Sequence, residues 1–131
     1  MKNDISAIGN ALVDTVFKVE HSLIAELGLE IDQMTLSSAE EHAPIIERLI
    51  ASGADTVSDC GGSATNSLVA AASFGAKCFH TCKVSDDQDG LRYLESLKDA
   101  GVGHKGNMAP AKNVPTGKCL ILVTPDAKRT M

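Results

Sequence analysis

Hydrophobic positions along the chain follow two different spacings, and each spacing predicts its own kind of element. Short apolar or β-branched runs bounded by Gly, Asn or Pro are typical of strands, whereas apolar residues three or four positions apart predict helices. Strands or extended segments are therefore expected at residues 4–9, 12–20, 34–36, 55–59, 76–84, 119–124 and 128–131. Helices are expected at residues 22–27, 38–52, 63–74 and 87–100, and residues 103–115 are expected to be irregular.

Particular residues mark where the first two helices begin and end. Ser22 is expected to cap the first helix, which Gly28 would end. Ser37 or Ser38 is expected to cap the second helix. Pro44 fits that second helix only in its first turn, because deeper in the helix its ring would clash with the backbone.

The order of the predicted elements indicates the fold class. Strands alternate with helices, which favours an α/β fold with a parallel sheet. The helix at 87–100 is expected to bury Leu91, Leu94 and Leu97 on one face. The chain has 131 residues, a length typical of one domain.

Composition and charge exclude several classes of function. The net charge is −5, and the densest basic pair is Lys128 with Arg129, which argues against phosphate-backbone binding. One Tyr and three Phe offer few platforms for stacking bases. Apolar runs reach only about five residues, well short of the ~18 that a membrane span needs, and no signal peptide is apparent. We therefore expect a cytoplasmic protein with no nucleic-acid partner and no membrane partner.

The cysteines and histidines give no support for a metal site. No cysteine pair has C-x-x-C spacing, so reduced and mostly buried thiols are expected at Cys60, Cys78, Cys82 and Cys119. The four histidines are scattered, and none has a neighbour at metal-ligand spacing. We expect no metal ligands in this chain.

The first candidate site follows the first predicted strand, in the run GNALVD. Gly9 allows a tight turn, and Asn10 and Asp14 could together bind neighbouring hydroxyl groups of a ligand. Ligands of open α/β sheets collect where strands end, as this one does. The alternative is that Asn10 is a turn residue and Asp14 a solvated charge, and the spacing alone leaves both open.

The second candidate site is the run CGGSATN, which leads into the third predicted helix. It is neither a P-loop nor a dinucleotide-binding fingerprint. Gly61 and Gly62 leave backbone N–H groups open to a polar or anionic ligand, and Asn66 is close enough to reach the same ligand. The alternative is a plain glycine turn with Ser63 or Thr65 as an ordinary helix cap.

Two further runs carry charge. In KVSDDQDG at 83–90 the carboxylates do not fit an EF-hand loop, and Asp86 and Asp87 are better explained as cap and first-turn charges of the next helix. In PTGKC at 115–119, with Arg129 across the following turn, the arginine could bind phosphate oxygens or be a solvated charge.

Taken in order, the four runs resemble the N-terminal part of a ribokinase-type (PfkB) carbohydrate kinase. Lys118 with Cys119, and the ending at Arg129, resemble its adenosine-kinase-like branch. The resemblance covers essentially the whole chain. It implies a Rossmann-like α/β ribokinase fold, here partial, with a small β-sheet lid built from segments near 14–20, 33–36, 55–60 and 117–131.

The resemblance also implies an activity and a set of site residues. The activity would be ATP-dependent phosphoryl transfer to a hydroxymethyl group of a nucleoside or sugar, with ATP and Mg²⁺ as cofactors. Cys119 and Met131 would face the substrate's base, and Arg129 would approach the transferring phosphates. The sugar would be bound by Asn10, Asp14, Gly61, Gly62, Ser63 and Asn66.

One departure from the family limits what this chain is expected to do alone. Family members are more than twice as long, and their catalytic aspartate lies in a Gly-rich motif near the C-terminus that does not occur here. We therefore expect no catalytic residue in residues 1–131 and no turnover by them alone. The alternative is a non-catalytic metabolite-binding or dimerising module, in which lid strands would pair two copies. A Rossmann oxidoreductase is disfavoured because G-x-G-x-x-G is missing.

Overall fold

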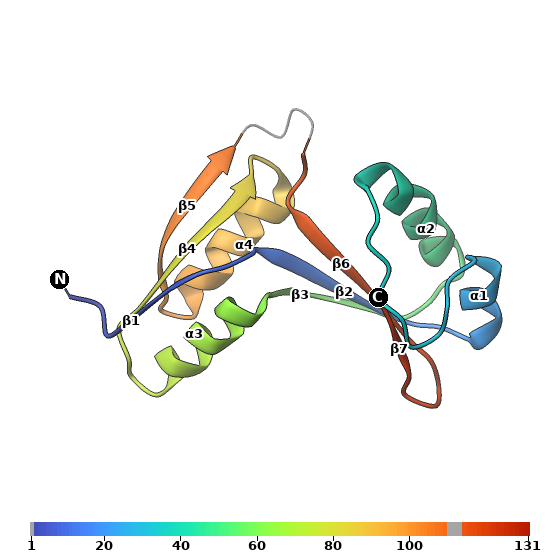
Figure 1. Ribbon diagram of the computed structural model, residues 1–131, viewed down its shortest axis with the longest axis horizontal. Coiled ribbons are helices and arrows are strands. Elements are labelled where there is room, and N and C mark those ends of the chain that lie inside the picture. The colour runs from blue at the N-terminus through green and yellow to red at the C-terminus, as the bar shows by residue number, and fades with distance from the viewer. Residues whose placement is uncertain (1, 110–113) are drawn as a thin grey trace. The chain divides into compact units, whose positions relative to one another are not determined.

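The computed structural model describes residues 2–109 and 114–131 (Figure 1). These residues form two compact units. Unit 1 comprises residues 1–13 and 60–118, and unit 2 comprises residues 14–59 and 119–131. Three strands contain residues of both units: β2 (Leu12–Lys18), β3 (Thr56–Gly61) and β6 (Gly117–Val123).

Unit 1 is built on a parallel sheet. Its strands are β1 (Ile5–Ile8), β4 (Cys78–Ser85) and β5 (Gly103–Ala109), in the order β1-β4-β5. Helix α3 (Ser63–Ser73) packs on β1 and β4, and α4 (Gln88–Asp99) packs on β4 and β5. The expected α/β fold with a parallel sheet is confirmed. The buried apolar core consists of Ala11, Leu68, Cys78, Cys82, Val84, Tyr93, Leu97 and Val102.

Unit 2 is built on a second sheet with the order β3-β2-β6-β7. Strand β7 (Arg129–Thr130) pairs antiparallel with β6. Two helices, α1 (His21–Glu26) and α2 (Ala39–Ala51), contribute apolar side chains to the core of this unit. That core consists of Phe17, Val19, Leu23, Ile24, Leu49 and Leu122.

Two helix starts differ from the sequence prediction. Glu20, not Ser22, is the N-cap of α1, and its side chain makes no capping hydrogen bond. The cap of α2 is Ser38, which forms a reciprocal capping box with Glu41, as the sequence pattern favours. Pro44 lies in the second turn of α2 rather than the first. Its missing N–H leaves one carbonyl near the helix start without its usual partner, which one helix end tolerates.

The expected strand at 34–36 is wrong. This segment has no strand conformation, although Thr35 N donates to Met131 O at 2.7 Å and Met131 N donates to Gln33 O at 3.0 Å. Two isolated backbone hydrogen bonds hold it beside the last residue without forming a ladder. Its apolar side chains, Met34 and Leu36, are exposed.

The segment at 103–115 was expected to be irregular, but residues 103–109 form β5. The polar sequence of β5 has little intrinsic preference for a strand, so pairing with β4 determines its conformation. Residues 110–113 of the expected segment lie outside the described residues. In α4 the buried face also differs: Leu97 and Tyr93 are buried, while Leu91 is 54% exposed.

Strand β1 lies at an edge of the parallel sheet and carries apolar side chains in contact with solvent. Ile5 is 43% exposed and Ile8 is 85% exposed. The sheet face opposite α3 and α4 is also polar and open at Thr81 and Lys83, which both lie exposed on β4. Purely parallel sheets normally have both faces covered.

Candidate functional site

In unit 1, the end of β1 and the start of α3 are in direct backbone contact. Gly62 is the N-cap of α3. Its φ is +107°, a backbone conformation that residues other than glycine rarely adopt. A Cβ atom at Gly62 would lie 2.6 Å from the Asn10 carbonyl oxygen. The two candidate runs therefore meet within unit 1, at Asn10 and Gly62.

A second close approach lies one residue before Asn10. A Cβ atom at Gly9 would lie 2.6 Å from Cβ of Ala64 in the first turn of α3. A larger residue at position 9 would therefore collide with the start of α3. The small residue lets the end of β1 pack against the helix start.

The segment after β1 and the first turn of α3 both present polar groups to solvent. Asn10, Ser63 and Asn66 are all exposed, and their side chains form no hydrogen bond with another described residue. They can therefore contact a ligand without breaking an internal bond. The backbone of Asn66 closes the first turn by donating to Gly62 O at 2.9 Å.

The alternative in which Ser63 or Thr65 caps this helix is wrong. Gly62 occupies the N-cap position, and no side chain makes a capping hydrogen bond there. Thr65 is 2% exposed, and its hydroxyl bonds to two other buried side chains.

A cavity of about 650 Å³ opens at the carboxyl ends of β1 and β4, the usual ligand position in open α/β sheets. Asn10 lines it, whereas Gly62 and Asn66 do not. The other lining residues belong to three segments of unit 1: 8–12, 81–85 and 114–117.

In unit 2, two carboxylates lie opposite each other on neighbouring strands. Thr15 Oγ1 and Ser58 Oγ are 3.1 Å apart, and Lys18 N donates to Asp55 O at 3.1 Å. Both pairs fit one antiparallel register of β2 and β3, and that register places Asp14 opposite Asp59. The sequence reading did not find Asp59, because only strand pairing brings it beside Asp14.

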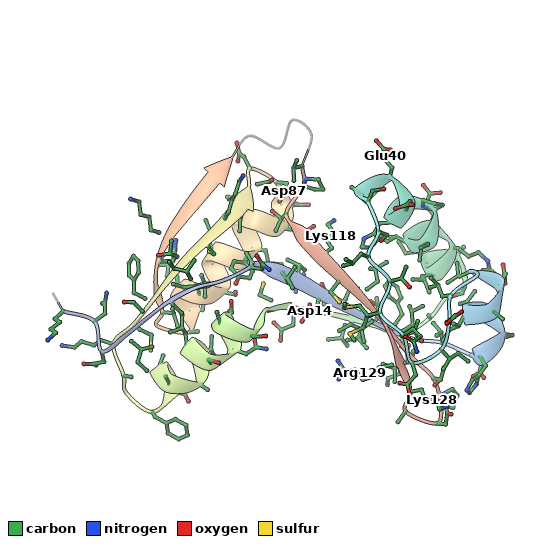
Figure 2. The ribbon with its side chains drawn as sticks, viewed as in Figure 1. Asp14, Glu40, Asp87, Lys118, Lys128 and Arg129 are labelled. Carbon is green, nitrogen blue, oxygen red and sulfur yellow. The ribbon has the colours of Figure 1, made fainter. Side chains whose placement is uncertain are left out.

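Cys119 and Arg129 lie on the next two strands of the same sheet. In the β6–β7 pair, Val123 is opposite Arg129, so alternation along β6 places Cys119 on the same face as Arg129. Leu120 and Leu122 point the other way, into the core of unit 2. We call Asp59, Asp14, Cys119 and Arg129 the polar row, with one residue on each of β3, β2, β6 and β7 (Asp14 and Arg129 are labelled in Figure 2).

The members of the polar row alter one another's proton affinity. Burial raises the pKa of Asp14, and repulsion from Asp59 raises it further, while Arg129 partly offsets both. Burial also raises the pKa of the Cys119 thiol, as does the negative charge of Asp14. The expected substrate-facing residue Met131 follows β7 directly and is 37% exposed.

The run at 83–90 leads into helix α4 one residue later than expected, because Asp86 precedes the cap and the acidic residue of the first turn is Asp89. Asp87, which is labelled in Figure 2, is the N-cap of α4 and accepts hydrogen bonds from Gly90 N at 2.8 Å, Thr116 N at 2.8 Å and Thr116 Oγ1 at 2.7 Å. Burial alone would raise the pKa of Asp87, but these hydrogen bonds and nearby Lys118 outweigh it and lower the pKa. The run at 115–119 is thereby fixed to the start of α4.

A larger cavity, of about 760 Å³, lies within unit 2 and contains none of the predicted site residues. Its lining includes Lys18, Glu20 and the Glu26–Arg48 ion pair, whose atoms are 2.6 Å apart at closest. The lining is of mixed charge and offers no group of convergent ligand-binding side chains.

All four cysteines are free, and two of them, Cys78 and Cys82, are buried. In the part of the chain that the structure describes, no three or more His, Cys, Asp or Glu side chains are grouped so as to hold a metal ion. Among the same residues, no helix has the length and apolar character required to cross a membrane.

Comparison with known protein families identifies the class. Residues 6–131 match the pfkB family carbohydrate kinases. The chain belongs to this family, as its sequence runs predict. Among curated protein sequences, no match is found.

Solved structures similar to this chain include sugar kinases and adenosine kinases. A probable sugar kinase of Rhizobium etli CFN 42 has 26% identity and a TM-score of 0.78, over 97% of this chain and 37% of its own. The adenosine kinase of Sinorhizobium meliloti has 30% identity and a TM-score of 0.74, over 98% and 38%. The adenosine kinase of Anopheles gambiae, solved with P1,P4-di(adenosine-5) tetraphosphate, has 26% identity and a TM-score of 0.78, over 95% and 37%.

These similarities confirm the partial ribokinase fold with its small β-sheet. The chain spans just over a third of the length of the solved structures that it matches.

Proposed function

We propose that this chain supplies the substrate-binding and lid portion of a kinase that transfers a phosphoryl group from ATP to a hydroxymethyl group of a nucleoside or sugar. Membership of the carbohydrate kinase family supports the reaction class. The observation that carries the assignment of the site is the contact between Asn10 and Gly62. It joins both candidate runs at the N-terminus of a helix, where backbone N–H groups and exposed amide side chains are available.

Each site residue receives a role that fits its chemistry. Asn10 and Asn66 can both donate to and accept from sugar hydroxyls, and Gly61, Gly62 and Ser63 bring the backbone close to them. From unit 2, Asp14 accepts hydrogen bonds from hydroxyls on both of its oxygens when it is ionised, and Arg129 binds phosphate oxygens. Cys119 and Met131 contact the base if the substrate is a nucleoside. The adenosine kinases among the similar structures favour that substrate class.

The ATP and Mg²⁺ that this reaction needs are assigned to residues outside this chain. Among the described residues, no three or more His, Cys, Asp or Glu side chains are grouped so as to form a metal centre of protein ligands alone. The sequence also contains no P-loop to bind a triphosphate. No catalytic step through either cofactor is therefore assigned to residues 1–131, and the catalytic base is expected elsewhere in the complete protein.

A binding panel tests the proposal. The melting temperature of the 131-residue chain is measured with a set of nucleosides and sugars, for the wild type and for Asp14→Ala. The matched control is Asp126→Ala, an exposed aspartate in the same unit outside the polar row. At least one nucleoside or sugar should raise the melting temperature of the wild type and the control but not of Asp14→Ala.

Two results would contradict the proposal. An equal shift in all three proteins would remove Asp14 from the site, and turnover of ATP by the chain alone would place catalysis within residues 1–131. Pairing of two copies through the lid strands stays a prediction, which sedimentation of the chain over a concentration series would test. Cytoplasmic location likewise stays a prediction.

A further inference from the structure

Beneath the turn at Gly61 and Gly62 lies a group of buried polar side chains that the proposed function does not use. Thr65 from α3 is 2% exposed, and His80 from β4 and Tyr93 from α4 are fully buried. Because His80 contacts side chains of both helices, α3 and α4 cover the same face of the sheet. All three residues belong to unit 1.

The three side chains are joined by hydrogen bonds. Thr65 Oγ1 lies 3.2 Å from His80 Nε2 and is also hydrogen-bonded to the Tyr93 hydroxyl. Tyr93 OH lies 3.4 Å from His80 Nε2. We call Thr65, His80 and Tyr93 the buried triad.

The buried triad is connected to both backbone segments of the candidate site. Tyr93 OH donates to the carbonyl of Gly61 at 3.4 Å, and His80 Nδ1 lies 3.4 Å from the carbonyl of Ala7, near the end of β1. The ring of His80 also lies close to Gly9, since a Cβ atom there would be 3.7 Å from Cε1. Five elements of unit 1 thus meet at these three side chains.

The partners of His80 determine which ring nitrogen carries the proton. A carbonyl oxygen only accepts, so Nδ1 must donate to Ala7 O. In the neutral ring Nε2 is then the acceptor, and a hydroxyl of Thr65 or Tyr93 donates to it. Each hydroxyl has one proton to donate and can also accept, so the two protons serve two of three acceptors at a time: Nε2, the carbonyl of Gly61 and the other hydroxyl.

The polarity of the triad needs a reason beyond packing. Three apolar side chains of similar volume would fill this space without the cost of removing polar groups from water. Hydrogen bonds are directional, whereas apolar contacts are not, and here they end on the two backbone segments that form the site.

We propose that Thr65, His80 and Tyr93 are positioning residues that hold the Gly61–Gly62 turn and the end of β1 in the geometry required to bind substrate hydroxyls. This inference rests on the proposed function for the identity of the ligand. The inference adds a physical cause for the shape of the site, namely the hydrogen bonds of the buried triad. Loss of one hydroxyl from the triad should loosen the turn and weaken binding, although no triad residue is assigned a contact with the ligand.

The test compares two substitutions of one residue in the 131-residue chain. Thr65→Val keeps the shape of the side chain and removes the hydroxyl, and Thr65→Ser keeps the hydroxyl and removes the methyl group. The dissociation constant of the nucleoside or sugar that stabilises the wild type most is measured by calorimetry. Thr65→Val should raise it about tenfold, and Thr65→Ser should keep it within about threefold of the wild type.

Hydrogen exchange of the backbone amide of Asn66, which donates to Gly62 O at 2.9 Å, gives a second readout that needs no ligand. Exchange should be faster in Thr65→Val than in Thr65→Ser, while amides of α2 in unit 2 stay unchanged. If Thr65→Val does not fold, Tyr93→Phe replaces it, with Ser96→Ala as the control, because Ser96 Oγ bonds to the backbone of Tyr93 and not to the triad.

The outcomes separate the two proposals. If the wild type binds no member of the panel, the proposed function fails, and the amide exchange alone decides the role of the triad. If the wild type binds and the variant without the hydroxyl matches its control in both affinity and exchange, the positioning role is overturned. A fall in stability with unchanged affinity and exchange would also overturn it, since that is the signature of an ordinary core residue.

Discussion

The two units of the chain differ in the kind of polar group that each contains, although both bury some hydrogen-bonded threonines. Unit 1 contains buried, uncharged polar side chains beside the candidate site: Thr65, His80 and Thr116 are almost inaccessible, and each has a hydrogen-bond partner. Unit 2 keeps its main polar group nearer the surface, where Asp14 and Arg129 belong to the polar row. In unit 1 the internal hydrogen bonds fix the backbone, whereas in unit 2 the charges alter one another's proton affinity.

Under the proposed function, this difference separates two tasks. A site that binds hydroxyls needs a backbone of fixed shape, and a buried hydrogen-bonded network supplies it. A site that responds to charged groups needs side chains whose charge a ligand can reach. Substitutions in unit 1 should therefore act mainly through stability and shape, and substitutions in the polar row mainly through charge.

The largest effect is expected from a glycine in unit 1. Gly62→Ala should lower the free energy of unfolding by about 3 kcal/mol, because it combines a strained backbone with a Cβ atom 2.6 Å from Asn10 O. Gly53→Ala in unit 2 is the matched control: its φ is +69°, but nothing lies within 4 Å of the added atom. That control should lose only about 1 kcal/mol. Urea denaturation measures both, and equal losses would contradict the close contact.

The caps of two helices give the next comparison. Asp87→Ala in unit 1 should cost about 2 kcal/mol, because it removes an N-cap that also holds Thr116. Ser38→Ala in unit 2 removes an exposed capping box and should cost about 1 kcal/mol or less. Urea denaturation of both variants measures the two losses, and the reverse order would contradict the additional role of Asp87 in holding Thr116.

The Asp87 cap also predicts a pH dependence. The pKa of Asp87 is lowered in the folded state. The contribution of its charge to the free energy of unfolding is therefore complete above the pKa that Asp87 has in the unfolded chain. That contribution is lost as the pH falls through the folded-state pKa. The stability difference between the wild type and Asp87→Asn should therefore shrink on acidification, and a constant difference would exclude this cause.

Asp14→Asn should have a smaller effect on stability, with the opposite sign. The pKa of Asp14 is raised on folding, so its contribution is complete below the unfolded-state pKa and is lost as the pH rises through the folded-state pKa. The variant should thus match the wild type in acid and become the more stable protein at neutral pH. Its ligand binding should be lost. Unfolding curves at several pH values test this sign. Arg129→Gln removes the charge that lowers the pKa of Asp14, so the stability lost as the pH rises should be larger in that variant.

The smallest effect is expected at the exposed ion pair of unit 2. Arg48 and Glu26 are joined by two hydrogen bonds, but both side chains are largely in solvent, where ion pairs contribute little. Arg48→Ala should leave the unfolding midpoint unchanged within error and should not alter ligand binding. A clear loss of binding would instead implicate the large cavity of unit 2.

The sequence predicted those features that local pattern determines. The strand at β1, the Ser38 cap and the helix beginning after Gly62 each depend on neighbouring residues, and the structure has all three. Strand β5 was missed because its polar residues have little strand preference and its conformation comes from pairing with β4. The expected strand at 34–36 failed for the converse reason: a suitable apolar run found no continuous ladder.

The candidate site shows the same division. The runs that contain Asn10, Asp14 and Gly62 could be found by eye, because glycine and polar residues follow apolar strands. The pairing of Asp14 with Asp59 and the burial of Thr65 with His80 join residues far apart in the sequence. No local spacing encodes such contacts, so only the folded chain reveals them.

The open edge of β1 has a practical consequence for handling this polypeptide. An edge strand with unpaired backbone groups and a side chain as exposed as Ile8 is a template to which other extended chains can add. We therefore expect purified residues 1–131 to self-associate at the concentrations that spectroscopy requires. Dilute samples, or co-expression with a polypeptide that caps this strand, will keep the material monodisperse.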